Sequence, residues 1–116
     1  MKRASLILSN GRSACERCLV ADRALGRMRG LLGRKSLASG DGLLLKPAGS
    51  VHTFFMRFSI DVVFLDRDLS VLGVTPELAP WRTAGRKGAR AVLELPAGEA
   101  GRRGIRAGDR LEFAAA

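Results

Sequence analysis

The chain has 116 residues, a length typical of one domain and sufficient to bury a core without a metal or a disulfide. Hydrophobic residues make up 47% and charged residues 27%, proportions that exclude a disordered chain. No apolar run approaches the ~18 residues that cross a bilayer, and the apolar stretch 4–8 is too short for a secretory leader, so we expect a cytoplasmic protein with no membrane partner and with reduced thiols.

The formal charge of +9 is carried mainly by arginine, with sixteen arginines against four lysines. Arginine, alanine and glycine share GC-rich codons, so part of this excess can reflect genome composition rather than selection for a partner. The charge predicts long-range attraction to polyanions but not specific binding.

The first third of the chain predicts two short strands followed by a helix. Strands are expected over 5–9 and 17–21, with a turn at Asn10-Gly11 between them. From Asp22 the apolar residues recur at helical spacing, which predicts one amphipathic helix near 22–33. Asp22 can cap its start, and Gly33 is a suitable C-terminal stop.

The rest of the chain predicts β structure. Val62–Leu65 is continuously apolar, so we expect a strand covered on both faces, paired as a hairpin with 69–74 around Asp66–Asp68. The other expected elements are strands over 42–46, 51–55, 89–95 and 110–113, an irregular loop over 76–88, and a helical turn over 97–103. About seven or eight short strands predict a mostly β single-domain sandwich or open barrel over 1–116, with its core in 17–113 and frayed ends at 1–4 and 114–116.

Five short motifs, in order, resemble the domain of unknown function 192 family. They are Arg27-x-x-Gly30-Leu31-Leu32-Gly33-Arg34, then Gly42-Leu43-Leu44, then Ser59-Ile60-Asp61-Val62-Val63-Phe64-Leu65-Asp66, then Leu93-Glu94-Leu95-Pro96-Ala97-Gly98, and finally Gly104-Ile105-x-x-Gly108-Asp109. The resemblance spans about Val20 to Phe113. It implies a compact β-rich domain with one helix near the N-terminus, and it implies no reaction.

The chain departs from that family at one motif. Many members carry Trp-Met-x-Asn-Thr ahead of the segment that matches Ser59-Ile60-Asp61, whereas this chain has His52-Thr53-Phe54-Phe55-Met56 in the same register. A role that depends on the indole or the amide of the family motif is therefore not expected here. Many members are also exported, unlike the location expected for this chain.

Cys15-x-x-Cys18 has the spacing of a redox or metal motif, but its surroundings do not match either use. A structural zinc site needs four ligands, and the chain offers one histidine and no second cysteine pair. A thioredoxin-type pair follows a strand and opens a helix, whereas this pair precedes an expected strand. We expect ordinary thiols, no metal and no cofactor; redox sensing and a metal shared with another chain remain alternatives.

Asp61 directly precedes the most apolar strand, where a carboxylate is costly unless a cation or several donors satisfy it. Arg27 and Arg34, at the two ends of the expected helix, are the cations we assign to it. The pair can lock the helix onto the sheet, or form the floor of a cleft with His52 and Thr53. His52, the sole histidine, could also act as a general base oriented by Asp61.

The aromatic and basic residues give a further alternative. Phe54, Phe55, Met56 and Phe58 are expected in the core or lining a pocket. Single-strand binding proteins place cations beside an aromatic residue. The residues that could do so here are Trp81, Arg82, Arg86, Lys87 and Arg90. No nucleic-acid motif accompanies them, so a solvated basic surface is the simpler interpretation.

The sequence therefore predicts a non-catalytic binding or accessory module that recognises a partner protein or a small ligand and is a monomer or weak dimer. Its ligand-binding residues would be Arg27, Arg34, His52, Thr53 and Asp61. The alternatives are a non-specific nucleic-acid binder driven by the charge and a hydrolase-type enzyme using His52 and Asp61.

Overall fold

The computed structural model describes residues 2–21 and 34–115 and is mostly β. The helix expected near 22–33 lies outside the described residues. The described elements are β1 (Lys2–Leu8), β2 (Ser13–Ala21), β3 (Asp41–Leu45), β4 (Ser50–His52), β5 (Ile60–Leu65), β6 (Val71–Leu78), β7 (Thr83–Gly85), β8 (Ala91–Pro96), α2 (Glu99–Arg102) and β9 (Leu111–Phe113).

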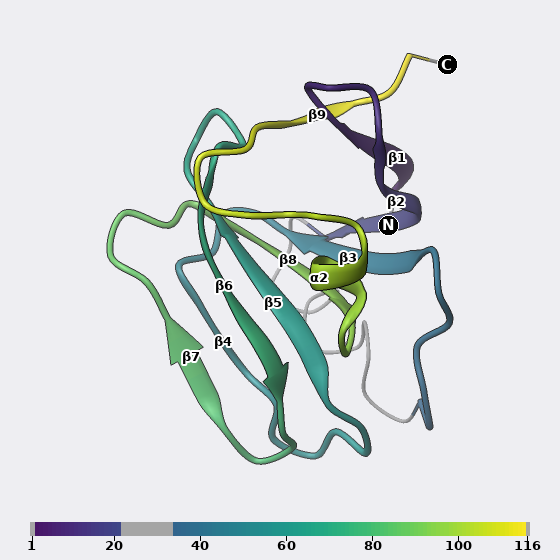
Figure 1. Ribbon diagram of the computed structural model, residues 1–116. Coiled ribbons are helices and arrows are strands. Elements are labelled where there is room, and N and C mark those ends of the chain that lie inside the picture. Colours follow the sequence, from purple (N-terminus) through teal and green to yellow (C-terminus); the bar gives the residue numbers. More distant parts are fainter. Residues whose placement is uncertain (1, 22–33, 116) are drawn as a thin grey trace.

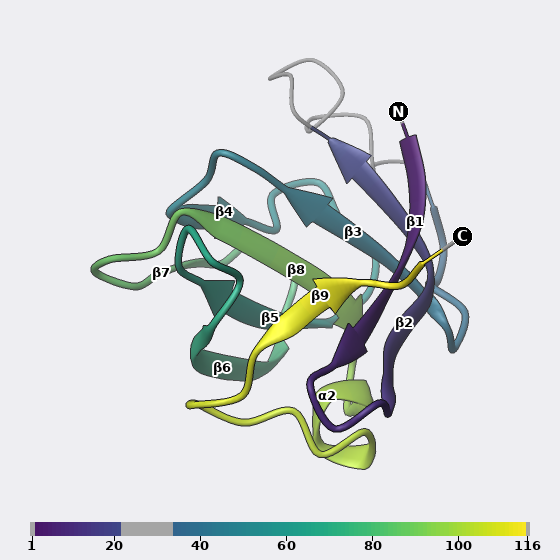
Figure 2. The ribbon, with the colours of Figure 1, turned by 90° about the horizontal axis from the view of Figure 1, so that it is seen from above.

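Seven of these strands form one curled sheet in the order β6-β5-β8-β3-β2-β1-β9, while β4 and β7 form a separate two-stranded ribbon (Figure 1). All pairings in the large sheet are antiparallel except β2 with β3. The curl brings the chain before β9 back to the start of β6, where Ser70 and Arg110 form a bridge and the Leu111 amide donates to the Leu69 carbonyl at 2.9 Å. The sheet is thus a half-barrel tied at one corner, which confirms the expected open barrel (Figure 2).

Apolar residues cover both faces of the central strands. Along β5, Val63 and Leu65 pack in one buried cluster, whereas Val62 and Phe64 pack in a second cluster on the opposite face. Successive side chains of a strand point to opposite faces, so a continuously apolar strand requires two covered faces. The expectation of a doubly covered strand over Val62–Leu65 is confirmed.

A bulge in β2 places both cysteines on one face. Ala4 pairs with Cys18 and Leu6 with Cys15, so three steps on β2 oppose two steps on β1. Residues three apart in a regular strand would face opposite sides, and the extra residue corrects this. Cys15 and Cys18 are therefore fully buried in the same cluster, as free thiols.

The structure corrects three expectations. Residues 76–88 are not a single loop, because β6 continues to Leu78 and β7 lies within the segment, paired with β4. Residues 2–4 are not a frayed end, because Lys2 pairs with Val20 in the sheet. Leu6 of β1 is fully buried, so the core begins before residue 17. Helix α2 lies inside the expected helical turn at 97–103.

No helix within the described residues is long and apolar enough to cross a membrane.

Candidate functional site

The Asp61 carboxylate accepts hydrogen bonds from backbone amides. It lies in β5, is 1% exposed, and its Oδ1 accepts hydrogen bonds from the amides of Glu77 and Gly98, each at 2.9 Å. Its Oδ2 accepts from the Ala100 amide of α2, also at 2.9 Å. The carboxylate therefore joins the end of β6 and the start of α2 to the central strand, and this polar satisfaction offsets the cost of its burial.

Arg34 does not pair with Asp61, so that expectation is wrong for this arginine. Its side chain instead lines a pocket formed with residues of β1, β2 and β3. Arg27, the other expected partner, lies outside the described residues. Backbone amides supply the donors instead of arginine, because the end of β6 and the start of α2 both lie next to Asp61 near the start of β5.

Thr53 is fully buried and acts as a clamp between two loops. Its hydroxyl donates to the Ala79 carbonyl at 2.6 Å and accepts from the Arg82 amide at 2.9 Å. Its own amide donates to the Arg82 carbonyl at 2.8 Å, and its carbonyl accepts from the Trp81 and Met56 amides at 3.0 and 3.1 Å. These bonds fix the segments 53–56 and 79–82 against each other.

The clamped loops carry an exposed aromatic cluster of His52, Phe54, Phe55 and Trp81. The His52 ring stacks on Phe54 with centroids 4.9 Å apart, and Phe54 stacks on Trp81 at 5.9 Å. The Phe55 ring lies against Trp81 at 4.7 Å, tilted by 59°. Phe54 is 37% exposed, Trp81 54% and Phe55 68%. Expecting Phe54 and Phe55 in the core or lining a pocket was wrong: Met56 turns inward from this loop, and both phenylalanines face solvent.

Among the described residues, His52 and Asp61 have separate hydrogen-bond partners. The His52 Nδ1 accepts from the Phe54 amide at 3.3 Å, and Asp61 is bonded to the three amides described above. Among the described residues, no hydrogen bond or ion pair joins Asp61 to Arg34, His52 or Thr53. The four described residues of the expected cleft floor therefore have separate roles. Asp61 binds backbone amides and Thr53 joins two loops. His52 belongs to the aromatic cluster, and Arg34 lines a separate pocket.

The basic residues expected beside Trp81 are exposed, but they are not equivalent. Arg82 donates from Nη1 to the Trp81 carbonyl at 3.2 Å, so it flanks the aromatic cluster. The Arg86 guanidinium lies 5.8 Å from the Phe64 ring centroid, and a side chain at Gly73 would collide with it. Arg86 therefore covers the apolar face of the sheet, while Lys87 and Arg90 are exposed on the loop between β7 and β8.

The carboxyl groups with shifted pKa values include those of Glu94 and Glu16. Burial raises the pKa of Glu94, on β8, to about 7. Hydrogen bonds from Arg103 and Ser13 lower the pKa of Glu16 to about 2. Arg103 also approaches Glu99 at 3.4 Å, so it ties β2 to α2.

Within the described residues, no group of three or more histidine, cysteine or acidic side chains is placed to hold a metal ion.

The two thiols interact with each other. A hydrogen bond with Cys18 lowers the pKa of Cys15, and the same bond together with burial raises the pKa of Cys18. Both side chains are fully buried, so neither thiol is accessible to a solute in the folded chain.

The fold and site together define a small half-barrel domain with a solvent-facing aromatic cluster. The family profile of DUF192, described as "Uncharacterized ACR, COG1430", matches residues 6–113. The chain belongs to this family. It is 36% identical over 97 residues to the UPF0127 protein PF1050 of Pyrococcus furiosus, a match covering 80% of this chain and 83% of that protein. The UPF0127 protein PYRAB11210 of Pyrococcus abyssi is 42% identical over 65 residues, which span 55% of each chain.

Two solved structures share the fold. A protein of Sinorhizobium meliloti, described as a "putative transcription regulator", aligns with a TM-score of 0.83 and 25% identity over 96% of this chain and 92% of its own. A protein of unknown function from Novosphingobium aromaticivorans aligns with a TM-score of 0.80 and 23% identity over 95% and 83%. The second likeness concerns the fold alone.

Proposed function

We propose that this chain is a non-catalytic binding module that docks an acidic segment of a partner protein on the aromatic cluster of His52, Phe54, Phe55 and Trp81. The observation that carries the proposal is the joint exposure of three large aromatic side chains, in which Phe54 stacks on Trp81 and Phe55 lies tilted against it. Exposed aromatic groups of this kind supply most of the binding energy at protein interfaces.

The backbone beneath the cluster supports a functional role. Phe55 has a φ of 67° and Trp81 a φ of 64°, both in the left-handed region. A bulky residue there costs on the order of 1–2 kcal/mol. The same two side chains are also exposed, so neither feature favours stability. Binding a partner accounts for both, because the strained loops hold the rings toward solvent.

The charge of the chain supports an acidic occupant. The formal charge is +9, and the exposed Arg57 and Arg82 follow the aromatic residues in their two loops. An acidic segment would meet cations at the rim and apolar rings at the centre, the usual arrangement of an interface.

Trp81 is the sole tryptophan, so its emission reports directly on the cluster. The probe is a synthetic peptide that interleaves glutamate with leucine and phenylalanine, compared with a peptide in which glutamine replaces glutamate. We expect a saturable change in Trp81 emission with the acidic peptide and a weaker one with its neutral partner.

Phe55→Asn removes one ring of the cluster and suits the left-handed backbone, because asparagine tolerates that conformation. Phe113→Asn is the matched control, since Phe113 is a 45% exposed aromatic residue on β9. Binding should weaken about tenfold or more in Phe55→Asn and persist in Phe113→Asn. No saturable change in wild type, or equal binding by both variants, would sink the proposal.

Single-stranded nucleic acid is the second candidate partner. Arg82 beside Trp81 is the arrangement in which bases stack on a ring while phosphates meet a cation. A labelled oligothymidylate would then bind with an affinity that falls steeply as salt rises, through the same Phe55-dependent cluster. Negligible binding at low salt would remove this candidate and leave the peptide proposal standing.

The proposal includes a cytoplasmic location. The free thiols of Cys15 and Cys18 support it, because paired cysteines are usual where the environment is oxidising.

A further inference from the structure

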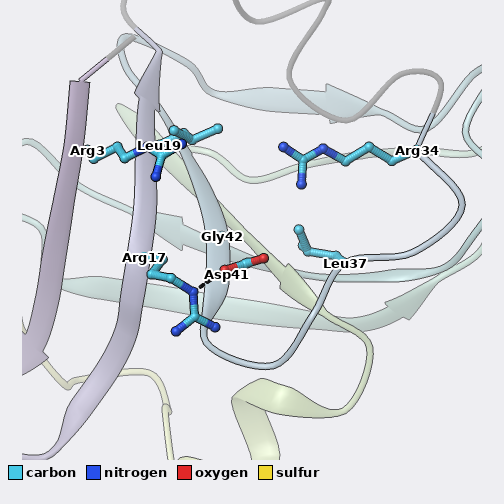
Figure 3. A pocket seen from close by; sticks show the side chains of 7 residues that line it. All are labelled: Arg3, Arg17, Leu19, Arg34, Leu37, Asp41 and Gly42. Carbon is cyan, nitrogen blue, oxygen red and sulfur yellow. Dashed lines mark hydrogen bonds and ion pairs between the residues drawn. The ribbon is translucent and has the colours of Figure 1, made fainter.

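A second feature, away from the aromatic cluster, is a basic pocket on the sheet. It has a volume of about 230 Å³ and is lined by Arg3, Arg17, Leu19, Arg34, Leu37 and Asp41, among others (Figure 3). Among the described residues, three guanidinium groups and one carboxylate line it, so this part of the lining has a positive formal charge. Nothing in the proposed function uses these residues.

The register of the sheet builds the floor of this pocket. Arg3 on β1 lies opposite Leu19 on β2, and Arg17 on β2 lies beside Asp41 on β3. Residues 17 and 19 share one face because side chains alternate along a strand. Cys18, between them, points into the buried cluster on the other face. Basic and acidic residues thus gather on the face of β1, β2 and β3 opposite that core.

Arg17 is held in position from two sides. Its Nε donates to Asp41 Oδ1 at 2.6 Å, and its Nη2 donates to the Ser39 carbonyl at 2.7 Å. Gly40 makes this possible, because a side chain there would lie 2.7 Å from the Arg17 Nη2, and its φ of 90° also suits glycine. A fixed guanidinium loses less entropy when it binds an anion than a mobile one does.

Arg34 completes the wall. Figure 3 shows its side chain extending from the segment before β3 over the sheet, toward the strands that carry Leu19 and Arg3. Leu37, from the same segment, adds an apolar surface and packs with the buried cluster on this face. The pocket therefore combines cationic groups with a leucine-lined side.

We propose that this pocket binds a small organic anion with a carboxylate or phosphate head and a short apolar body. The head would sit among the guanidinium groups of Arg3, Arg17 and Arg34, since guanidinium forms charge-assisted, often bidentate hydrogen bonds to both head groups. The apolar body would lie against Leu19 and Leu37. A volume of about 230 Å³ suits a small molecule.

Anion binding is measured by titrating isotope-labelled protein with sodium phosphate or sodium butyrate, at ionic strength held constant with chloride. The readout is the arginine Nε–H resonances of Arg3, Arg17 and Arg34. We expect saturable shifts at these three arginines with at least one anion. The anion that binds with the higher affinity identifies the preferred head group.

Arg34→Gln removes one cation from the wall, and Arg67→Gln removes an exposed cation from the turn between β5 and β6 as the matched control. Binding should weaken about tenfold or more in Arg34→Gln and stay unchanged in Arg67→Gln. Arg3→Gln, on a different element, should weaken binding as well and keeps the test valid if one variant folds poorly.

Linear, unsaturated shifts with both anions would overturn the inference, as would equal affinities of Arg34→Gln and Arg67→Gln. The inference stands apart from the aromatic cluster, because Phe55→Asn should leave anion binding intact. Failure of the peptide proposal and failure of the pocket proposal are thus separate results.

Discussion

Asp61→Ala should be strongly destabilising, because the Asp61 carboxylate joins the central strand β5 to the end of β6 and the start of α2 through hydrogen bonds. Its two oxygens accept three amide hydrogen bonds, each at 2.9 Å, at a side chain only 1% exposed. A hydrogen bond to a charged group contributes about 1.5–3 kcal/mol, and losses that share one acceptor group are not additive. We expect Asp61→Ala to lower the free energy of unfolding by about 3–5 kcal/mol.

Asp61→Asn separates the effect of these hydrogen bonds from the effect of side-chain volume, because asparagine and aspartate have nearly the same size. The asparagine oxygen can still accept from Glu77 and Gly98, but its amide nitrogen would face the buried Ala100 amide, donor against donor. The expected loss is about 1–3 kcal/mol, smaller than for alanine. Urea unfolding followed by circular dichroism measures both variants. Losses below about 0.5 kcal/mol for both would refute the clamp, since surface substitutions typically fall in that range.

Three further outcomes are expected. Phe55→Asn should raise the free energy of unfolding by about 1 kcal/mol, because it relieves a left-handed phenylalanine at φ 67°. A decrease of similar size, measured by thermal or urea unfolding, would argue that the Phe55 ring packs for stability. The pKa of Glu94 is raised from 4.5 to about 7, so the folded chain holds its proton longer than the unfolded chain, and the free energy of unfolding should fall by up to about 3 kcal/mol as pH rises from 4.5 to 7. Urea titrations across that range should show this fall in wild type and lack it in Glu94→Gln; parallel curves for the two proteins would count against it. Cys15 and Cys18 should react with a thiol-specific disulfide reagent only as the chain opens, so rapid labelling of the native protein would contradict their burial.

Most of the fold could be predicted from local patterns. The apolar run Val62–Leu65 and the polar turn after it specify a central hairpin because both are read from neighbouring residues. The strand Thr83–Gly85 could not be predicted, since its three residues are exposed or half-buried and its pairing with β4 depends on a distant segment. The bulge that turns both cysteines inward also arises from pairing between strands, and no spacing rule reveals it.

The candidate site was harder to predict than the fold. The sequence pointed to Asp61, His52 and Thr53 as polar residues among apolar ones, yet it could not show which partners satisfy them. Asp61 and Thr53 are satisfied by backbone groups, whose positions depend on how loops converge. Phe55 was expected in the core or lining a pocket because phenylalanine is usually buried, and the left-handed backbone turns it outward.

The most direct test of whether the aromatic cluster is the docking face is to map where the acidic peptide binds on the chain. Backbone amide shifts in isotope-labelled protein should concentrate at residues 52–57 and 79–83 as the peptide is added. They should disappear in Phe55→Asn and persist in Phe113→Asn. Shifts centred on Arg3, Arg17 and Arg34, or spread evenly over the basic surface, would contradict the account.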